Sequence, residues 1–191
     1  MTDKDLNRIH KDIVSLLEEK LPDYLTYHSL KHTLYVLNRA VYIAGKEGVS
    51  GNDLRLLKVA TLCHDIGFIE THVNHEEISC KIVRKYFKSY NLTEDEVDTV
   101  CGMIMATRIP QEPKNLLEEI IADADLEYLS TNKFESVSDK LFTELKHYSP
   151  KLTKQEWDKI QIKFIQNHKY FTKYCRHYKE HRKIKNLNTL L

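Results

Sequence analysis

The sequence predicts an all-α fold. Apolar residues recur at intervals of three and four along most of the chain, the spacing that gathers them on one face of a helix. The alternation of apolar and polar residues that marks a half-buried strand is nowhere sustained. Only five glycines and four prolines occur among 191 residues, as expected of helices joined by short turns.

Four helices are predicted in the first half of the chain. The first stops before Pro22, and its apolar stripe is Leu6, Ile9, Ile13 and Leu16. The second ends near Gly45, and its stripe is Leu30, Leu34, Leu37 and Val41. The third runs from Asp53 to Ile66 with Gly67 as its C-terminal cap, and one face carries Leu54, Leu57 and Ala60. The fourth spans His75 to Phe87.

Four more helices are predicted in the second half. Thr93 and Glu96 form a capping-box pattern that opens the fifth, whose apolar residues are Val97, Val100 and Ile104 and which stops before Pro110. The sixth carries Leu117, Ile121 and Ala124, and the seventh carries Phe134, Leu141 and Leu145. Thr153 and Glu156 form the same capping pattern before a last long helix that contains Trp157, Ile160 and Phe164.

Composition narrows the class of protein. The length fits one domain with a sizeable core, and the chain is 41% hydrophobic and 30% charged. No apolar run approaches the roughly 18 residues of a membrane span, and the N-terminus lacks a secretion-signal pattern. The four cysteines, Cys63, Cys80, Cys101 and Cys175, are widely separated, which argues against a disulfide framework and a cysteine-rich zinc site. We therefore expect a cytoplasmic protein without a membrane partner.

The charge balance argues against nucleic acid as a partner. The formal net charge is +1, so no global basic field attracts a polyanion. The stretch HKYFTKYCRHYKEHRKIK near the C-terminus is locally basic, and we interpret it as a solvated helix face. Its Tyr170, Phe171 and Tyr174 could stack on nucleobases, but their helical spacing favours a packing seam.

Three segments place costly polar residues where burial is expected. In ATLCHDIGF the pair His64 and Asp65 interrupts an apolar run, and a buried carboxylate without a partner costs several kcal/mol. In YHSLKHTLYVL, His28 and His32 lie four residues apart, hence on one face of the predicted second helix. Asp125 lies four residues from both Ile121 and Leu129, in line with the core.

A divalent cation would compensate four of these groups together. His32, His64, Asp65 and Asp125 lie on three predicted helices, and their mixture of imidazole and carboxylate suits Mn, Fe, Zn, Ni or Mg. Each residue alone also has a structural interpretation. A core histidine can bond a backbone carbonyl, and an aspartate can cap a helix. Spacing by itself leaves both interpretations open.

The ordered set His32, His64-Asp65 and Asp125 resembles the signature of the HD superfamily of metal-dependent phosphohydrolases, an all-helical fold named for its His-Asp pair. Further stretches are similar to compact HD hydrolases described as predicted phosphohydrolases: NHEEIS, IADADLEYL, EWDKIQIKFIQNHKYFT and KIKNLNTL. The resemblance implies a single HD domain over residues 1–191, with the metal site within 28–125 and a C-terminal helical extension over 150–191.

Carried over by position, the resemblance implies that His32, His64, Asp65 and Asp125 are ligands of a divalent cation. Leu126 follows Asp125 as Leu follows the last ligand of related phosphodiesterases, which favours Asp125 over Asp123.

The segment YHSLKH is similar to the YHNxxH motif of cyclic nucleotide phosphodiesterases, whose first histidine donates a proton. This likeness implies that His28 is the general acid, and Asp65 is expected also to orient the attacking water. Ser29 stands where Asn is common, and Ser130 where Gly is frequent.

The implied activity is hydrolysis of a phosphomonoester or phosphodiester, of a nucleotide, by a metal-activated water. The alternative is a non-catalytic HD module that binds a metal or nucleotide as a sensor or interaction domain. Some polar residues have an open role. His72, His75 and Glu76 either line the pocket, bind a second metal or lie at the surface, and Lys31 and Arg108 either grip phosphate or carry ordinary solvated charge.

Overall fold

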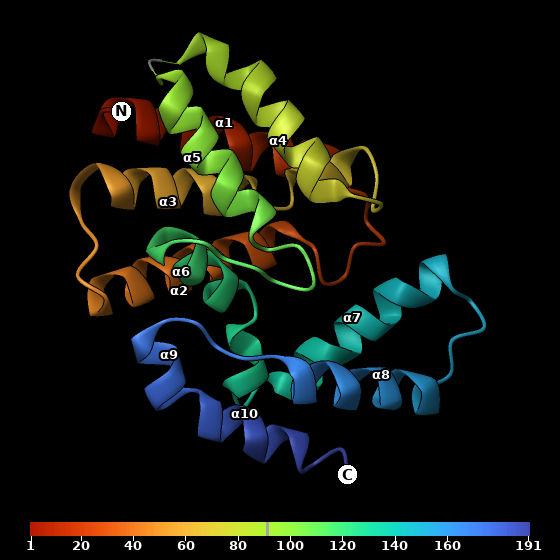
Figure 1. Cartoon of the computed structure of the whole chain (residues 1–191). Coiled ribbons are helices and arrows are strands. Elements are labelled where there is room, and N and C mark those ends of the chain that lie inside the picture. Colours follow the sequence, from red (N-terminus) through yellow and green to blue (C-terminus); the bar gives the residue numbers. More distant parts are fainter. Residues whose placement is uncertain (91) are drawn as a thin grey trace.

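The computed structural model describes residues 1–90 and 92–191, and within these residues every regular element is a helix (Figure 1). The predicted all-α class is therefore confirmed. The described residues also contain no helix that is both long and apolar enough to span a membrane.

Six helices form the first half of the molecule. They are α1 (Asp3–Lys20), α2 (Leu30–Lys46), α3 (Gly51–Cys63), α4 (His75–Tyr86), α5 (Glu94–Met105) and α6 (Leu116–Asp125). Helix α2 packs against α3 and α6, and α3 also contacts α1 and α5. The predicted capping box at Thr93 opens α5, and a further capping box at Thr2, which was not predicted, opens α1. The main apolar core lies among these helices.

Four helices form the second half, drawn in blue-green to blue in Figure 1. They are α7 (Phe134–Tyr148), α8 (Lys154–Asn167), α9 (Lys173–Tyr178) and α10 (Glu180–Leu187). Helix α8 begins at the predicted Thr153 capping box. A smaller apolar cluster joins α7 and α8 to the end of α6. The expected C-terminal helical extension over 150–191 thus contains three helices, and the bounds of the short helices α9 and α10 were not predicted.

The third helix ends earlier than predicted. It stops at Cys63, and residues Ile66–Ile69 form a short 3-10 helix, η1, that contains Gly67. Gly67 is therefore not the C-terminal cap of α3. A methyl group at Gly67 would overlap the carbonyl oxygen of His75, so this glycine permits the first turn of α4 to pack directly on η1.

The second helix was predicted with the wrong start and the wrong buried face. Its N-cap is Ser29, so His28 lies in the preceding loop and does not share a helix with His32. Leu34 of the predicted stripe is 38% exposed, whereas Val36 and Ala40 are fully buried. The buried face is thus the one that carries His32.

Buried polar contacts attach the C-terminal segment to the first half. Asp123 accepts hydrogen bonds from the backbone amides of Phe171 and Thr172, both at 2.8 Å, and from the Thr172 hydroxyl. Lys179 pairs with the buried carboxylate of Glu127. The interpretation of the basic stretch as a solvated face is wrong for Lys179 and Lys183, because both side chains are buried.

Candidate active site

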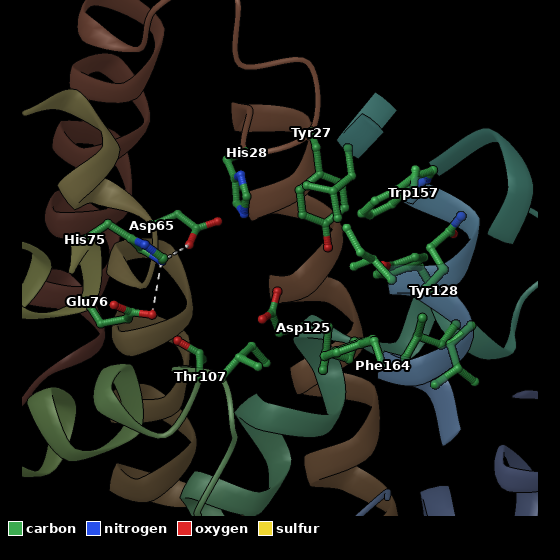
Figure 2. Close-up of a pocket in the computed structure, with 17 residues that line it drawn as sticks. Tyr27, His28, Asp65, His75, Glu76, Thr107, Asp125, Tyr128, Trp157 and Phe164 are labelled. Atoms are coloured by element: carbon green, nitrogen blue, oxygen red, sulfur yellow. Dashed lines mark ion pairs between the residues drawn. The ribbon is translucent and has the colours of Figure 1, made fainter. Parts of the chain in front are cut away.

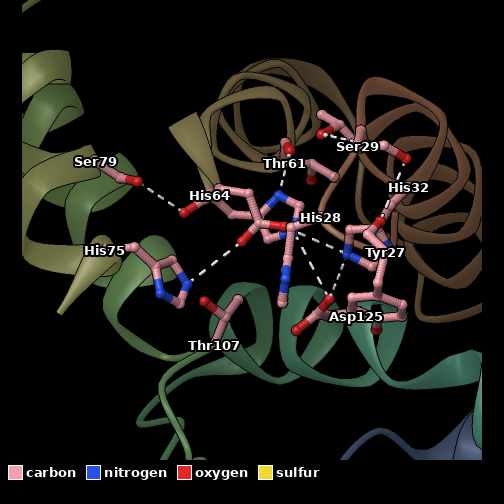
Figure 3. A network of polar contacts seen from close by, with 12 residues as sticks. Tyr27, His28, Ser29, His32, Thr61, His64, His75, Ser79, Thr107 and Asp125 are labelled. Carbon is pink, nitrogen blue, oxygen red and sulfur yellow. Dashed lines mark hydrogen bonds and ion pairs between the residues drawn. The ribbon is translucent and has the colours of Figure 1, made fainter. Parts of the chain in front are cut away.

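The predicted metal ligands come together where three helices meet. His64 and Asp65 directly follow α3, Asp125 is the last residue of α6, and His32 lies in the first turn of α2 (Figure 3). One ligand atom from each of His32, His64 and Asp125 lies within 4.8 Å of the other two. Asp123, two residues before Asp125, faces the C-terminal segment instead.

Both imidazoles face carboxylate oxygens. His32 Nε2 lies 3.1 Å from Asp125 Oδ1 and 3.5 Å from Asp65 Oδ2. His64 Nε2 lies 3.1 Å from Asp65 Oδ2 and 3.7 Å from Asp125 Oδ1. Each carboxylate therefore lies between the same two rings. Such a four-membered cluster is compact enough for all members to approach one small ion.

Local hydrogen bonds fix the orientation of His64. Its Nδ1 donates to the carbonyl oxygen of Thr61 at 2.8 Å, which leaves Nε2 directed at the carboxylates. The Ser79 hydroxyl donates to the His64 carbonyl at 2.9 Å and accepts from the amide of Gly67. The His-Asp corner is thus held between α3 and α4 by three hydrogen bonds.

The cluster contains buried atoms that lack a partner. His64 Nε2 and Asp65 Oδ2 are both buried, and neither makes a hydrogen bond within the described residues. Unsatisfied buried polar atoms are rare in native proteins and call for a missing ligand, water or ion. A divalent cation accepts electron pairs from neutral imidazole and from carboxylate, so these residues fit the implied metal.

The ionisation of the cluster reflects the same proximity. Burial disfavours charge on His64, but the carboxylates of Asp65 and Asp125 raise its pKa well above the usual value. Burial likewise opposes ionisation of Asp65, yet the neighbouring histidines, His64 foremost, hold the pKa of Asp65 well below its usual range. Burial opposes ionisation of Asp125 too, but His32 and His64 lower its pKa, so both aspartates are carboxylates at neutral pH, the form that binds metal.

A residue that the sequence analysis missed, Glu144 of α7, holds His28 in place. Its carboxylate bonds His28 Nδ1 and accepts the backbone amides of Tyr27 at 2.8 Å and His28 at 3.0 Å. Burial opposes protonation of His28, but the hydrogen bond to Glu144 and the charge of Asp65 together raise its pKa. Glu144 lies three residues after Leu141 on the apolar stripe of its helix, which was the available signal.

His28, Phe68 and His75 form a stack beside the cluster. The Phe68 ring of η1 lies 4.1 Å from both imidazoles, measured between ring centroids. His75 Nε2 lies 3.5 Å from Asp65 Oδ1 and 3.6 Å from Glu76 Oε1. The structure therefore places His75 and Glu76 at the pocket wall, next to the second oxygen of Asp65.

The remaining candidates lie outside this cluster. His72 is exposed and stacks on Tyr148, with centroids 3.9 Å apart. Arg108 pairs with Glu77 at 2.9 Å and with Glu76 at 3.6 Å. Lys31 lines a different cavity, described below.

A cavity of about 280 Å³ opens beside the cluster, between the first and second halves of the molecule. Figure 2 shows its polar end, with Asp65, His75 and Glu76, facing an aromatic end formed by Tyr128, Trp157 and Phe164. Helix α8 supplies most of the far wall. The sequence predicts that the side chains of α8 belong to a helix, but it does not reveal that they line a pocket.

Fold and site together define a helical protein with a histidine–aspartate cluster suited to a divalent cation. The HD domain family model matches residues 29–127, just over half of the chain and the segment that holds the whole cluster. The chain therefore belongs to the HD domain family, and the resemblance inferred from its ordered His and Asp residues is confirmed. A comparison with curated protein sequences finds no match.

Three solved structures share the fold. A Lactobacillus plantarum protein aligns with a TM-score of 0.72 at 15% identity, covering 99% of this chain and 94% of that one. Bacillus subtilis YpgQ, solved in complex with ADP, aligns with a TM-score of 0.66 at 18% identity, covering 98% of this chain and 93% of that one. A predicted HD superfamily hydrolase from an uncultured Thermotogales bacterium aligns with a TM-score of 0.57 at 22% identity, covering 82% of this chain and 88% of that one.

Proposed function

We propose that this protein is a metal-dependent phosphohydrolase that cleaves a phosphomonoester or phosphodiester of a nucleotide. The observation that carries the proposal is the convergence of His32, His64, Asp65 and Asp125, with unpartnered buried atoms among them, at one end of a cavity. Membership of the HD domain family supports the same class of reaction.

The proposed roles follow from what each group can do at its position. His32, His64, Asp65 and Asp125 would hold the cation, which when bound lowers the pKa of water and polarises a phosphoryl oxygen. His28 lines the cavity beside this cluster and carries a proton that it can donate to the leaving oxygen. Glu144 keeps the His28 ring in one orientation and stabilises its protonated form.

A nucleotide suits the chemistry of the cavity walls. None of the described residues that line it is a lysine or an arginine, so the charge of a phosphate must be met at the metal-ligand end. The opposite end offers the rings of Tyr128, Trp157 and Phe164, on which a nucleobase can stack. The complex of YpgQ with ADP supports a nucleotide as ligand of this fold.

Metal content is the first test, and the chain offers a matched pair of variants. Asp125 and Asp123 lie two residues apart at the end of α6, but only Asp125 faces the histidines. Protein purified without chelator should hold near-stoichiometric transition metal. Asp125→Asn should lose most of it, and Asp123→Asn should retain it. Wild-type protein that binds no metal and cannot be loaded with any would refute the mechanism.

Turnover is the second test. With the metal identified, phosphate release from nucleoside mono-, di- and triphosphates and from cyclic nucleotides would identify the substrate. Asp65→Ala should abolish turnover without unfolding the protein, and retained activity would exclude the assigned role. Metal and nucleotide binding without any turnover would favour the alternative, a sensor or interaction module.

A further inference from the structure

We propose that a second cavity, on the opposite side of the Tyr27 and Tyr128 rings, binds a small, multiply charged phosphate-bearing anion of the pyrophosphate type. This cavity has a volume of about 340 Å³ and lies between α2 and α7. Three lysines line it: Lys31, Lys133 and Lys140. We refer to it as the lysine cavity.

The three lysines line this cavity from two elements. Lys31 belongs to the first turn of α2, Lys133 is the N-cap residue of α7, and Lys140 lies seven residues later on the same face of that helix. Within residues 1–90 and 92–191, none of the three has an acidic group within 4.0 Å, in contrast to Lys154 and Lys179. Like charges around one concavity raise the local potential and attract an anion.

The serine and threonine hydroxyls that line the lysine cavity already donate to backbone carbonyls, so the lysines are left to recognise a ligand. The Thr26 hydroxyl donates to the Lys140 carbonyl at 2.7 Å, and the Thr131 and Ser136 hydroxyls donate to the carbonyls of Tyr128 and Lys133. Hydroxyls engaged in this way offer acceptors to a ligand, so the lysines supply the donors. An anion rich in oxygen acceptors therefore fits better than a neutral sugar or base.

The lysine cavity is distinct from the proposed reaction cavity. Among the residues that the structure describes, the two cavities share only Tyr27 and Tyr128, whose ring centroids are 5.7 Å apart. His28 and Asp65 line the reaction cavity, whereas His32 lines the lysine cavity. An anion bound there would lie against the ring of His32, behind the metal-ligand cluster.

Shape and overall charge favour a small anion over a nucleic acid. The volume falls within the range of small-molecule sites, roughly 300–1,000 Å³. The formal net charge of the whole chain is only +1, so the positive potential is local to the lysine cavity. Pyrophosphate should therefore bind more tightly than orthophosphate, which carries less charge.

The test is calorimetric titration of the full-length protein, as purified, with pyrophosphate. The combined variant Lys31→Gln, Lys133→Gln and Lys140→Gln removes the cavity lysines. Its matched control is Lys151→Gln, Lys159→Gln and Lys163→Gln, three exposed lysines outside the cavity. The first variant should weaken binding by at least about tenfold, and the control by less than about twofold. If the combined variant is unstable, each single substitution should still weaken binding by about threefold.

Three results would overturn the inference. Equal binding of pyrophosphate by the wild type and by the combined lysine variant would show that the lysine cavity is not the site. Binding that is lost in Asp125→Asn but kept in that variant would place the anion at the proposed metal centre, leaving the proposed function intact. A single-stranded oligonucleotide that displaces pyrophosphate would assign the lysines to a nucleic-acid surface instead.

Discussion

Asp65 presents its two carboxylate oxygens to different imidazoles. Oδ2 faces His64 and His32, whereas Oδ1 lies 3.5 Å from His75. A carboxylate that is 5% exposed would be costly alone, and here every neighbour can donate a proton or share a cation. These neighbours compensate the cost of burying the Asp65 carboxylate just after α3.

The pair of His28 and Glu144 gives a prediction about pH. The Glu144 carboxylate favours the protonated imidazole and so raises the pKa of His28. A general acid works only below its pKa, so kcat should fall as pH rises through that value. Removing the negative charge in Glu144→Gln lowers the pKa, and the alkaline limb of the kcat profile should move to lower pH, with at least about tenfold lower kcat at pH 8.

The control for this prediction is Glu135→Gln, an exposed glutamate on the same helix that forms no ion pair within the part of the chain that the structure describes. Its profile should match that of the wild type. An alkaline limb that stays in place in Glu144→Gln would show that His28 is not the titrating acid.

Single residues were predictable where burial made them expensive. His32, His64 and Asp125 stood out because each interrupts an apolar face, and the structure brings them together. Glu144 escaped notice because one glutamate in the mixed sequence of α7 resembles solvated charge. Its partner is 116 residues away along the chain, and no local pattern reveals such a contact.

At the scale of elements, helix ends build the site. His64 caps the C-terminal end of α3, and Asp125 closes α6. The C-terminal end of a helix carries partial negative charge, so two such ends add to the attraction for a cation between them. The proposed metal ligands therefore gain from these two helix ends, whereas the N-terminal end of α2 at His32 acts in the opposite direction.

The close contact at Gly67 predicts that alanine destabilises the protein at this position but not at a glycine without such a contact. Gly67→Ala would force the start of α4 away from η1, because the new methyl group overlaps the His75 carbonyl. We expect unfolding free energy to fall by about 1–3 kcal/mol, the usual cost of overpacking. Denaturant unfolding followed by circular dichroism measures this change.

Gly45→Ala is the control, because a methyl group there meets no atom within 4 Å and the residue is helical. That variant should be as stable as the wild type or more stable by up to about 1 kcal/mol. Equal effects of the two substitutions would contradict the packing assigned to Gly67.

The helices themselves were more predictable from the sequence than the contacts that they make. Eight helices follow from apolar spacing and capping residues, as at Thr93 and Thr153. The bounds of α9 and α10 were not predicted because distant partners stabilise these helices: Asp123 of α6 accepts from the Thr172 amide at the start of α9, and Glu127 pairs with Lys179. Propensity within a short basic stretch cannot report such contacts.

For the whole molecule, the reaction cavity depends on both halves of the chain. The first half supplies the proposed ligands, and α8 supplies the aromatic wall. The sequence indicated the C-terminal segment as an extension of the HD domain, but the order in which helices pack cannot be read from periodicity. Trp157 therefore looked like an ordinary core residue.

Trp157 is the only tryptophan of the sequence, which gives a direct report on nucleotide binding. Its ring lines the reaction cavity, and its Nε1 donates to the Ser138 hydroxyl at 3.2 Å. A nucleobase stacked there should change the emission of the protein in a saturable manner as ADP is added. Trp157→Phe should abolish this signal while calorimetry still detects binding. Saturation by ADP without any change in emission would place the base elsewhere.

The proposed ligands and the aromatic wall of the cavity beside them lie on different elements, which has a consequence for evolution. Helix α8 contributes Trp157, Ile160 and Phe164 to the wall, but none of the proposed ligands and neither member of the His28–Glu144 pair. Mutations on this helix can therefore accumulate in a lineage without touching the chemistry. Proteins that share the proposed ligands can therefore differ in the compounds they accept, and a laboratory library confined to these three positions explores the same variation.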